Sequence, residues 1–189
     1  MLDAIFAADT AAVTFVQNNL KCAFLDVVMP LITIFGENGI FWIAVALVLL
    51  CLNPKTRKIG AVMGLAMLMG LIFGNGLLKN LVARPRPYWL DENAAILVND
   101  LKDYSFPSGH SLVSFEAAVT LLLCKCKKTG IASLVIAFLV AFSRVYLYVH
   151  YPTDVIAGAL LGTLFAFVSF VIFDKYICRG SDEIRLKKT

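Results

Sequence analysis

The sequence predicts an all-α integral membrane protein: a bundle of six transmembrane helices with an N-terminal interfacial helix. Of its 189 residues, 60% are hydrophobic and only 16% are charged, and the mean hydropathy is +0.81. Soluble domains are about 45–50% apolar and about 25% charged. No polar stretch reaches the roughly 50 residues that a separate soluble domain needs. We therefore expect residues 1–189 to form a single membrane-embedded domain.

The first segment, residues 3–19, is expected to lie on the membrane surface. Its large apolar residues are separated by small or polar ones, a pattern typical of an interfacial helix; they are Ile5, Phe6, Val13, Phe15 and Val16. The segment has no basic start before a continuous apolar core, so it does not read as a signal peptide.

Six apolar runs follow and predict six membrane crossings. They cover about residues 20–35, 40–52, 59–78, 108–123, 131–149 and 155–177. The first two are short for a hydrocarbon core of about 30 Å. Glycines four residues apart allow helices to pack closely, and three such pairs occur: Gly60/Gly64, Gly70/Gly74 and Gly158/Gly162.

Basic loops predict the orientation. Residues 53–58, 125–128 and the tail from Lys175 fall on one side by parity, and the positive-inside rule makes that side cytoplasmic. We expect both termini there, in a plasma-membrane protein. The connection over 79–106 and the loop over 150–153 then share the outer face.

Ionisable residues gather on this outer face. The chain has only two histidines, and both are there with four cations and a carboxylate: His110, His150, Lys79, Arg84, Arg86, Arg144 and Asp154. Such residues beside membrane segments are costly and point to function. Cations on the outside run against the positive-inside rule, and an anionic ligand explains them. Arginine forks match phosphate oxygens, and lysine adds a point charge.

Two short segments add chemistry to this face. Ser108 suits the N-cap of the fourth crossing, where free N–H groups bind phosphate and Gly109 lets the backbone approach closely. His150 and Asp154 stand four apart, so they can meet if a helix starts near Pro152. A carboxylate fixes the tautomer of a neighbouring histidine and stabilises its imidazolium.

Two other ligand classes are disfavoured. Histidine and aspartate are metal ligands, but three or four cations around the site would repel a divalent ion and favour a phosphate dianion. The basic residues lie in short loops rather than in a stripe, so nucleic-acid binding is set aside. We expect no metal and no cofactor.

Three motifs make the chain resemble the type 2 phosphatidic acid phosphatase family. They are Lys79-x6-Arg86-Pro87, Pro107-Ser108-Gly109-His110 and Ser143-Arg144-x5-His150-x3-Asp154. Each motif is weak alone, but their order and spacing match together. The resemblance spans residues 79–154, and the layout of crossings extends it over nearly the whole chain. The family includes membrane lipid phosphatases and shares its site with vanadium haloperoxidases.

The resemblance implies a role for each motif residue. His150 attacks phosphorus to form a phosphohistidine, Asp154 orients it, and His110 protonates the leaving oxygen. The phosphate oxygens are held by Lys79, Arg86, Ser108, Gly109 and Arg144. Two roles are open for Arg84, which is not a motif residue: contact with a second phosphate or a headgroup, or an interfacial position. We expect the interfacial position, with much activity left in Arg84→Ala. The family needs no metal.

The substrate expected from this resemblance is a lipid phosphate or diphosphate that enters sideways from the bilayer. Undecaprenyl diphosphate is the first choice, and phosphatidylglycerol phosphate or phosphatidic acid follows closely. Two other classes stay open: an anion transporter that uses the outer cations as a vestibule, and a haloperoxidase. Transporters bind near the midplane, whereas these charges gather at helix ends. The sequence does not indicate an oligomeric state.

Overall fold

The protein was examined as a computed structural model, which describes residues 2–91 and 94–178. Within these ranges the chain is helical and has no strand. The α-helices are α1 (Leu2–Asn19), α2 (Ala23–Thr33), α3 (Ile40–Leu52), α4 (Pro54–Met69), α5 (Lys79–Val82), α6 (Gly109–Leu123), α7 (Lys127–Tyr146) and α8 (Pro152–Ile172). Shorter helical segments are η1 (Ile34–Gly39), η2 (Gly70–Leu78), η3 (Pro87–Leu90) and η4 (Phe173–Cys178).

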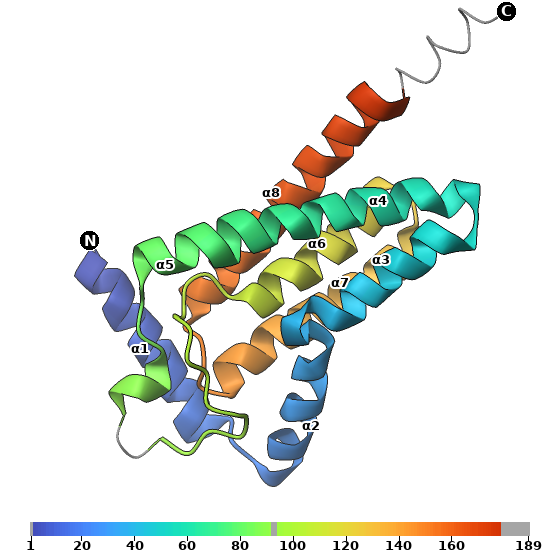
Figure 1. Cartoon of the computed structure of the whole chain (residues 1–189). Helices are drawn as coiled ribbons and strands as arrows, with labels where there is room; N and C mark the ends of the chain where they lie inside the picture. The colour runs from blue at the N-terminus through green and yellow to red at the C-terminus, as the bar shows by residue number, and fades with distance from the viewer. Residues whose placement is uncertain (1, 92–93, 179–189) are drawn as a thin grey trace, which may run out of the picture.

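Five helices, α3, α4, α6, α7 and α8, form a bundle with two distinct ends (Figure 1). At one end lie the α3–α4 and α6–α7 turns and the last turn of α8, and we call it the turn end. Lys58 of α4 and Asp174 after α8 form an ion pair of 2.9 Å there. At the other end α5, the start of α6 and the α7–α8 connection meet, and we call it the histidine end. The basic segments 53–58 and 125–128 thus share one end, opposite both histidines.

Glycines on α8 let it approach the central helix α6 closely. A Cβ atom at Gly158 would lie 2.5 Å from the carbonyl oxygen of Ser108, and one at Gly162 would lie 2.4 Å from that of Leu112. Any side chain there would push the two helices apart. The predicted packing role of this pair is confirmed. It brings the starts of α6 and α8 together, and the Ser108 amide donates to the carbonyl of Asp154 at 3.0 Å.

The glycines of the other two pairs differ in what they pack against. A Cβ atom at Gly60 would lie 2.5 Å from the carbonyl oxygen of Ala46, so this glycine does bring α3 and α4 together. Gly70 and Gly74 make room for side chains of α6. Gly64 has nothing within 4 Å of its Cβ position and lines a cavity instead. The packing role predicted for Gly64 is therefore wrong.

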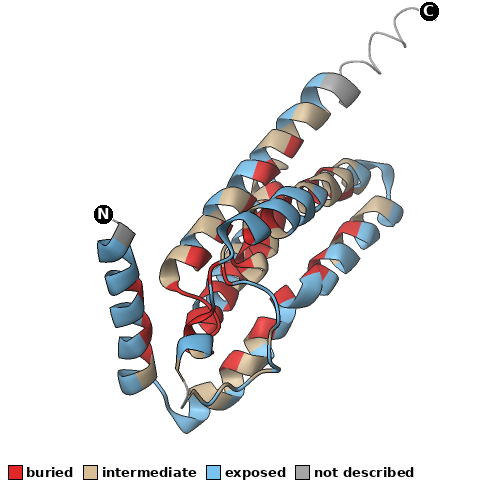
Figure 2. Cartoon of the chain, turned by 60° about the vertical axis from the view of Figure 1, so that its left-hand side comes forward, coloured by how far each residue is buried: buried red, intermediate tan, exposed pale blue. Residues whose placement is uncertain are grey.

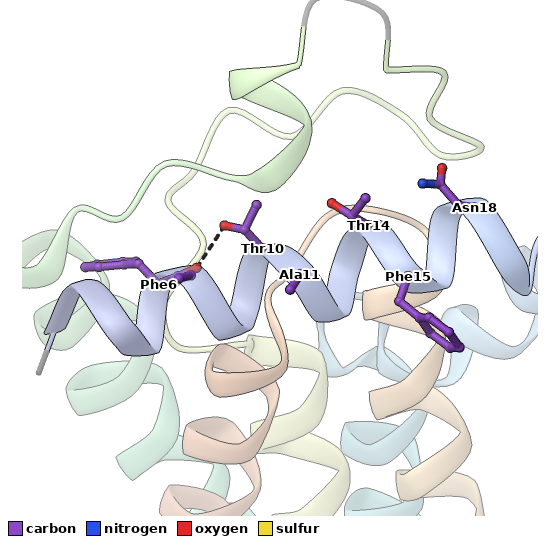
Figure 3. A pocket seen from close by; sticks show the side chains of 7 residues that line it. Phe6, Thr10, Ala11, Thr14, Phe15 and Asn18 are labelled. Carbon is purple, nitrogen blue, oxygen red and sulfur yellow. Dashed lines mark hydrogen bonds between the residues drawn. The ribbon is translucent and has the colours of Figure 1, made fainter.

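The helix α1 runs across the ends of the bundle helices at the histidine end (Figures 1 and 3). Its inward residues are buried, and they are Asp9, Val13 and Val16. Its outward groove has polar residues one turn apart, and they are Thr10, Thr14 and Asn18. This geometry suits the predicted interfacial helix. Because α8 ends at the turn end, the arrangement does not fit the prediction that both termini share one side.

The predicted six crossings also need revision. The helix expected over residues 20–35 is α2, whose 11 residues span about 16 Å and cannot cross a core of about 30 Å. Four stretches of the described chain are long and apolar enough to cross: Ala23–Leu52, Pro54–Leu90, Lys127–Tyr146 and Pro152–Lys175. The apolar α6 is shorter, although it is the most enclosed helix. The first two expected crossings fall in one stretch, which bends at Glu37 and Asn38.

Burial colouring shows exposed residues along the outer sides of the helices and buried residues where the helices face one another (Figure 2). Large apolar side chains face outward along the helices, among them Phe24, Ile131, Phe138, Leu160 and Leu164. An exposed apolar surface of this extent needs lipid around it. The chain is therefore an integral membrane protein, and its buried cations, Lys79, Arg84, Arg86 and Arg144, lie at the histidine end.

Candidate active site

The three sequence motifs converge on one cavity of about 820 Å³ at the histidine end. Six of the eight predicted site residues line it: Lys79, Arg86, Gly109, His110, Arg144 and His150. They come from α5, the segment after it, the first turn of α6, the last turn of α7 and the α7–α8 connection. The predicted shared face is thus confirmed as a shared cavity.

His150 lies in the connection between α7 and α8 and is 1% exposed. Its Nε2 is 3.2 Å from Nη1 of Arg86, and its Nδ1 is 3.3 Å from Oγ of Ser105. Arginine can only donate, so Nε2 must be the acceptor and the ring proton must sit on Nδ1. Burial, followed by Arg86, Arg144 and Lys79, lowers the pKa of His150 well below its usual value. The ring is therefore neutral near pH 7, with the Nε2 lone pair toward the cations.

Asp154 stands behind His150, fully buried in the first turn of α8. Its Oδ2 is 3.7 Å from Nδ1 of His150 and accepts hydrogen bonds from the Ser105 hydroxyl (2.5 Å) and the Tyr151 amide (2.9 Å). Because Ser105 donates to Asp154, its oxygen can accept the Nδ1 proton of His150. The predicted pairing of His150 with Asp154 is therefore present, and Ser105 bridges it.

A cationic pair stands beside the histidine. Arg86 binds the Oδ1 atom of Asp103 at 2.6 Å, and Lys79 binds the Oδ2 atom at 2.5 Å. Arg86 also donates to the backbone carbonyls of Asp103 and Val149, at 2.7 and 2.8 Å. Burial raises the pKa of Asp103, but Lys79 and Arg86 outweigh it and bring the pKa down to about 2. This carboxylate occupies the groups that we expected to hold phosphate.

Arg144 completes the cationic wall. It is 2% exposed, and its Nη1 donates to the Thr33 hydroxyl at 2.7 Å. Its Nε is buried and has no hydrogen-bond partner within the described chain. The Arg144 side chain lines the cavity, where its positive charge attracts an anionic ligand. This favours an anion in the cavity.

His110 lies across the cavity in the first turn of α6. Its Nε2 is 3.2 Å from Oε2 of Glu37, which comes from the bend before α3. Gly36 makes the room, because a Cβ atom there would lie 2.8 Å from the His110 ring. Glu37 lies between the first two expected crossings, and sequence reasoning missed it. The one available signal was a carboxylate between two glycines at a predicted outer loop.

Ser108 is placed differently from the other predicted ligands. It is the N-cap of α6, as predicted, and its Oγ accepts from the Ser111 amide at 3.4 Å. It is fully buried and does not line the cavity. In this structure Ser108 holds the helix start, while Gly109 presents the backbone to the cavity.

Arg84 is not the exposed interfacial residue that we expected. It is 7% exposed, and its Nη1 binds Oδ1 of Asp154 at 2.6 Å. Its Nη2 binds Oδ2 of Asp9 from α1 at 2.8 Å. The expectation of an interfacial Arg84 is therefore wrong, and with it the basis for a mild Arg84→Ala phenotype. Asp9 also escaped sequence reasoning, because it lies in a surface helix 75 residues away.

Below the polar residues the cavity continues as an apolar trough between α3 and α4. Its walls are mostly aliphatic: Ile43, Leu47, Leu50, Met67, Leu68 and Leu71. One carboxyl group interrupts this lining. Glu116 of α6 is 0% exposed, and neither of its side-chain oxygens has a partner in the described chain. A ligand suited to this cavity has an anionic head and a long apolar tail.

We expect Asp103→Asn to strengthen inhibition by vanadate about fivefold to tenfold, since the substitution removes a negative charge that competes for Lys79 and Arg86. Asp103 stays ionised above about pH 4, because its folded pKa of about 2 lies below its usual value. The gain should therefore be constant from pH 5 to pH 8. Inhibition constants measured across this range test it. Weaker inhibition in Asp103→Asn would mean that Asp103 mainly holds the two cations in place.

Comparison with known proteins agrees with this geometry. The family model described as PAP2 superfamily matches residues 55–178. An undecaprenyl-diphosphatase of Sulfolobus acidocaldarius is 37% identical over 155 residues, which cover 82% of this chain and 74% of that protein. Phosphatidylglycerophosphatase B of Bacillus subtilis is 40% identical over 117 residues, 54% of this chain and 55% of that protein.

A solved structure extends the likeness to the fold. The crystal structure of a transmembrane PAP2-type phosphatidylglycerolphosphate phosphatase from Bacillus subtilis matches with a TM-score of 0.69 and 31% identity. The match covers 92% of this chain and 88% of that one.

Proposed function

The chain belongs to the PAP2 superfamily of membrane lipid phosphatases, and we propose that it removes the terminal phosphate of a lipid diphosphate through a phosphohistidine on His150. The observation that carries this proposal is the cavity itself. It joins a neutral histidine and three cations to an apolar trough that fits a lipid tail. A vestibule for anion transport would need neither the buried Asp154 nor the orienting Ser105.

The proposed reaction has two steps. Nε2 of His150 attacks phosphorus, the bond to the leaving oxygen breaks, and His110, in its protonated form, donates a proton to that oxygen. A water then gives a proton to His110 and attacks phosphorus, the P–N bond breaks, and inorganic phosphate leaves. Asp154 acts through Ser105 to hold the Nδ1 proton in place, and its negative charge stabilises the positive charge that develops on the ring. The charge on the phosphoryl oxygens is met by Lys79, Arg86 and Arg144.

We place the active site at the outer membrane face. The basic segments of the turn end support this orientation under the positive-inside rule, and the histidine end then faces outward. The C-terminal end of α8 is cytoplasmic in this arrangement, whereas α1 lies along the outer interface.

Undecaprenyl diphosphate is the substrate that we propose first. The undecaprenyl-diphosphatase of S. acidocaldarius covers more of this chain than phosphatidylglycerophosphatase B does. The apolar trough suits a prenyl chain, which carries no polar group below its phosphates.

The detergent-purified protein should release phosphate from undecaprenyl diphosphate faster than from phosphatidylglycerol phosphate, phosphatidic acid or a soluble phosphate ester. Excess EDTA should not change this rate, since the cations take the place of a metal. Phosphate release with a His150→Ala blank measures both expectations. A folded protein that acts on none of the four substrates would overturn the phosphatase proposal, and zinc- or magnesium-dependent activity would overturn the metal-free reaction.

Phosphatidylglycerol phosphate is the second candidate, and Glu116 is the observation that favours it. Glu116 stands six residues after His110, about 9 Å along α6, among the residues that line the trough. A glycerolipid has ester and hydroxyl groups at such depths, and one hydrogen bond would satisfy the orphaned carboxyl. In the same assay, a preference for phosphatidylglycerol phosphate that Glu116→Leu abolishes and Glu116→Gln keeps would select this lipid.

A further inference from the structure

We infer that Asp9 and Arg84 are positioning residues for the His150–Asp154 pair, so that the N-terminal helix α1 is a working part of the active site. This inference rests on the proposed phosphohistidine reaction. Neither residue lines the cavity, and neither belongs to the three sequence motifs. Both act through Asp154.

Arg84 fixes one oxygen of the Asp154 carboxylate and so aims the other. Nη1 of Arg84 holds Oδ1 at 2.6 Å, which leaves Oδ2 to face Ser105 and His150. The guanidinium is itself held in a narrow slot. Its central carbon lies 3.9 Å from the ring centroid of Tyr151 and 4.8 Å from that of Phe6. Stacked in this way, Arg84 cannot swing away from Asp154 without losing both ring contacts.

Asp9 completes the arrangement from α1. Its carboxylate accepts from Nη2 of Arg84 at 2.8 Å and from the Thr153 amide at 3.1 Å, and the Thr153 hydroxyl binds it too. Thr153 directly precedes Asp154 in the first turn of α8, where a carboxylate is favoured by the helix dipole. Asp9 therefore fastens α1 both to the arginine and to the turn that carries Asp154.

The charges explain why all three residues are needed together. Asp9, Arg84 and Asp154 are 3%, 7% and 0% exposed, so none is solvated by water. One guanidinium lies between two carboxylates. Without Arg84 the two negative charges would be buried without their shared partner, and without Asp9 the guanidinium would lose one of its two carboxylate partners.

This network gives α1 a role beyond lying at the interface. Figure 3 shows α1 crossing the ends of the bundle helices, with Thr10, Thr14 and Asn18 turned away from them. On its inner face, Val13 and Val16 pack in the apolar cluster around Tyr146 and Leu147, next to the α7–α8 connection. Docking of α1 is thereby coupled to the connection that carries His150.

The test compares Asp9→Asn and Arg84→Lys with Asp3→Asn, a matched control that removes a carboxylate from an exposed position of the same helix. We expect kcat to fall about 10-fold to 100-fold in Asp9→Asn and Arg84→Lys. KM and the inhibition constant of vanadate should change less than threefold, because neither residue touches phosphate. Asp3→Asn should match the wild type, and Asp9→Glu should recover part of kcat.

In a double variant, Asp9→Asn with Arg84→Lys, kcat should fall little further than in the more impaired single variant, since the two residues act as a unit. Thermal unfolding in detergent identifies variants that fail to fold. If Asp9→Asn fails to fold, kcat of Asp9→Glu, which keeps the carboxylate, tests the inference instead. Wild-type kcat in a folded Asp9→Asn variant would overturn the inference while leaving the phosphatase proposal intact. A wild-type protein without phosphatase activity would instead remove the proposed function itself.

Discussion

Replacing His150 with alanine should lower phosphate release by about 10⁵-fold, the scale at which loss of a nucleophile is felt in other covalent enzymes. His150 is the neutral base whose Nε2 lone pair faces Arg86, whereas the other histidine of the cavity, His110, is paired with Glu37. The cations remain in the variant, so vanadate should still bind. Phosphate release and vanadate binding, measured on the same preparation, separate lost chemistry from a lost fold.

Trapping the intermediate adds a direct measurement. Wild-type protein quenched during turnover of a ³²P-labelled substrate should carry acid-labile, alkali-stable label, and His150→Ala should carry none. Imidazole added to His150→Gly should restore part of the release, because the ring can re-enter the space it left. Near-normal release from His150→Ala would refute the nucleophile assignment.

His110→Ala should lower release from lipid substrates by about 10³-fold, the usual scale for a lost general acid. The loss arises because a lipid alkoxide or phosphate leaves poorly without a proton. With p-nitrophenyl phosphate, whose leaving group needs no proton, the first step should recover. Water activation would remain slow, so the labelled phosphohistidine should accumulate in this variant.

A rapid-quench experiment on His110→Ala measures both steps. Glu37→Gln is the matched control, since it keeps the shape of the His110 partner but removes its charge, and we expect a loss of no more than about tenfold. If His110→Ala lowered the rate equally with the lipid substrate and with p-nitrophenyl phosphate, His110 would bind phosphate rather than transfer protons.

Several features of this site were readable from the sequence because they depend on local chemistry. The N-cap at Ser108 and the start of α8 at Pro152 follow from residue type and position. The spacing of His150 and Asp154 predicted their encounter, and parity of the apolar runs predicted a common end for both histidines. Each of these needed only a helix period or a loop direction.

Other predictions were wrong because the features concerned depend on where a helix bends or docks. The crossing expected over 20–35 became the short helix α2, since Asn38 and Gly39 adopt positive φ angles of 47° and 67° and turn the chain into α3. Apolar periodicity marks both sides of such a bend alike. Apolar periodicity therefore predicts that the stretch lies in the membrane, but it does not predict where the chain changes direction.

The sequence by itself determined the membrane class, the motif residues and the end of the bundle at which they meet, because long apolar runs and their polar ends dictate those. Only the tertiary structure decided which carboxylates face which cations. Asp9, Glu37 and Asp103 come from three separate segments, and each partner is contributed by another element. Lys79, Arg84 and Arg86 are buried and need such partners, since an unpaired charge is too costly inside the protein. Their burial does not reveal which carboxylate is the partner until the helices are packed.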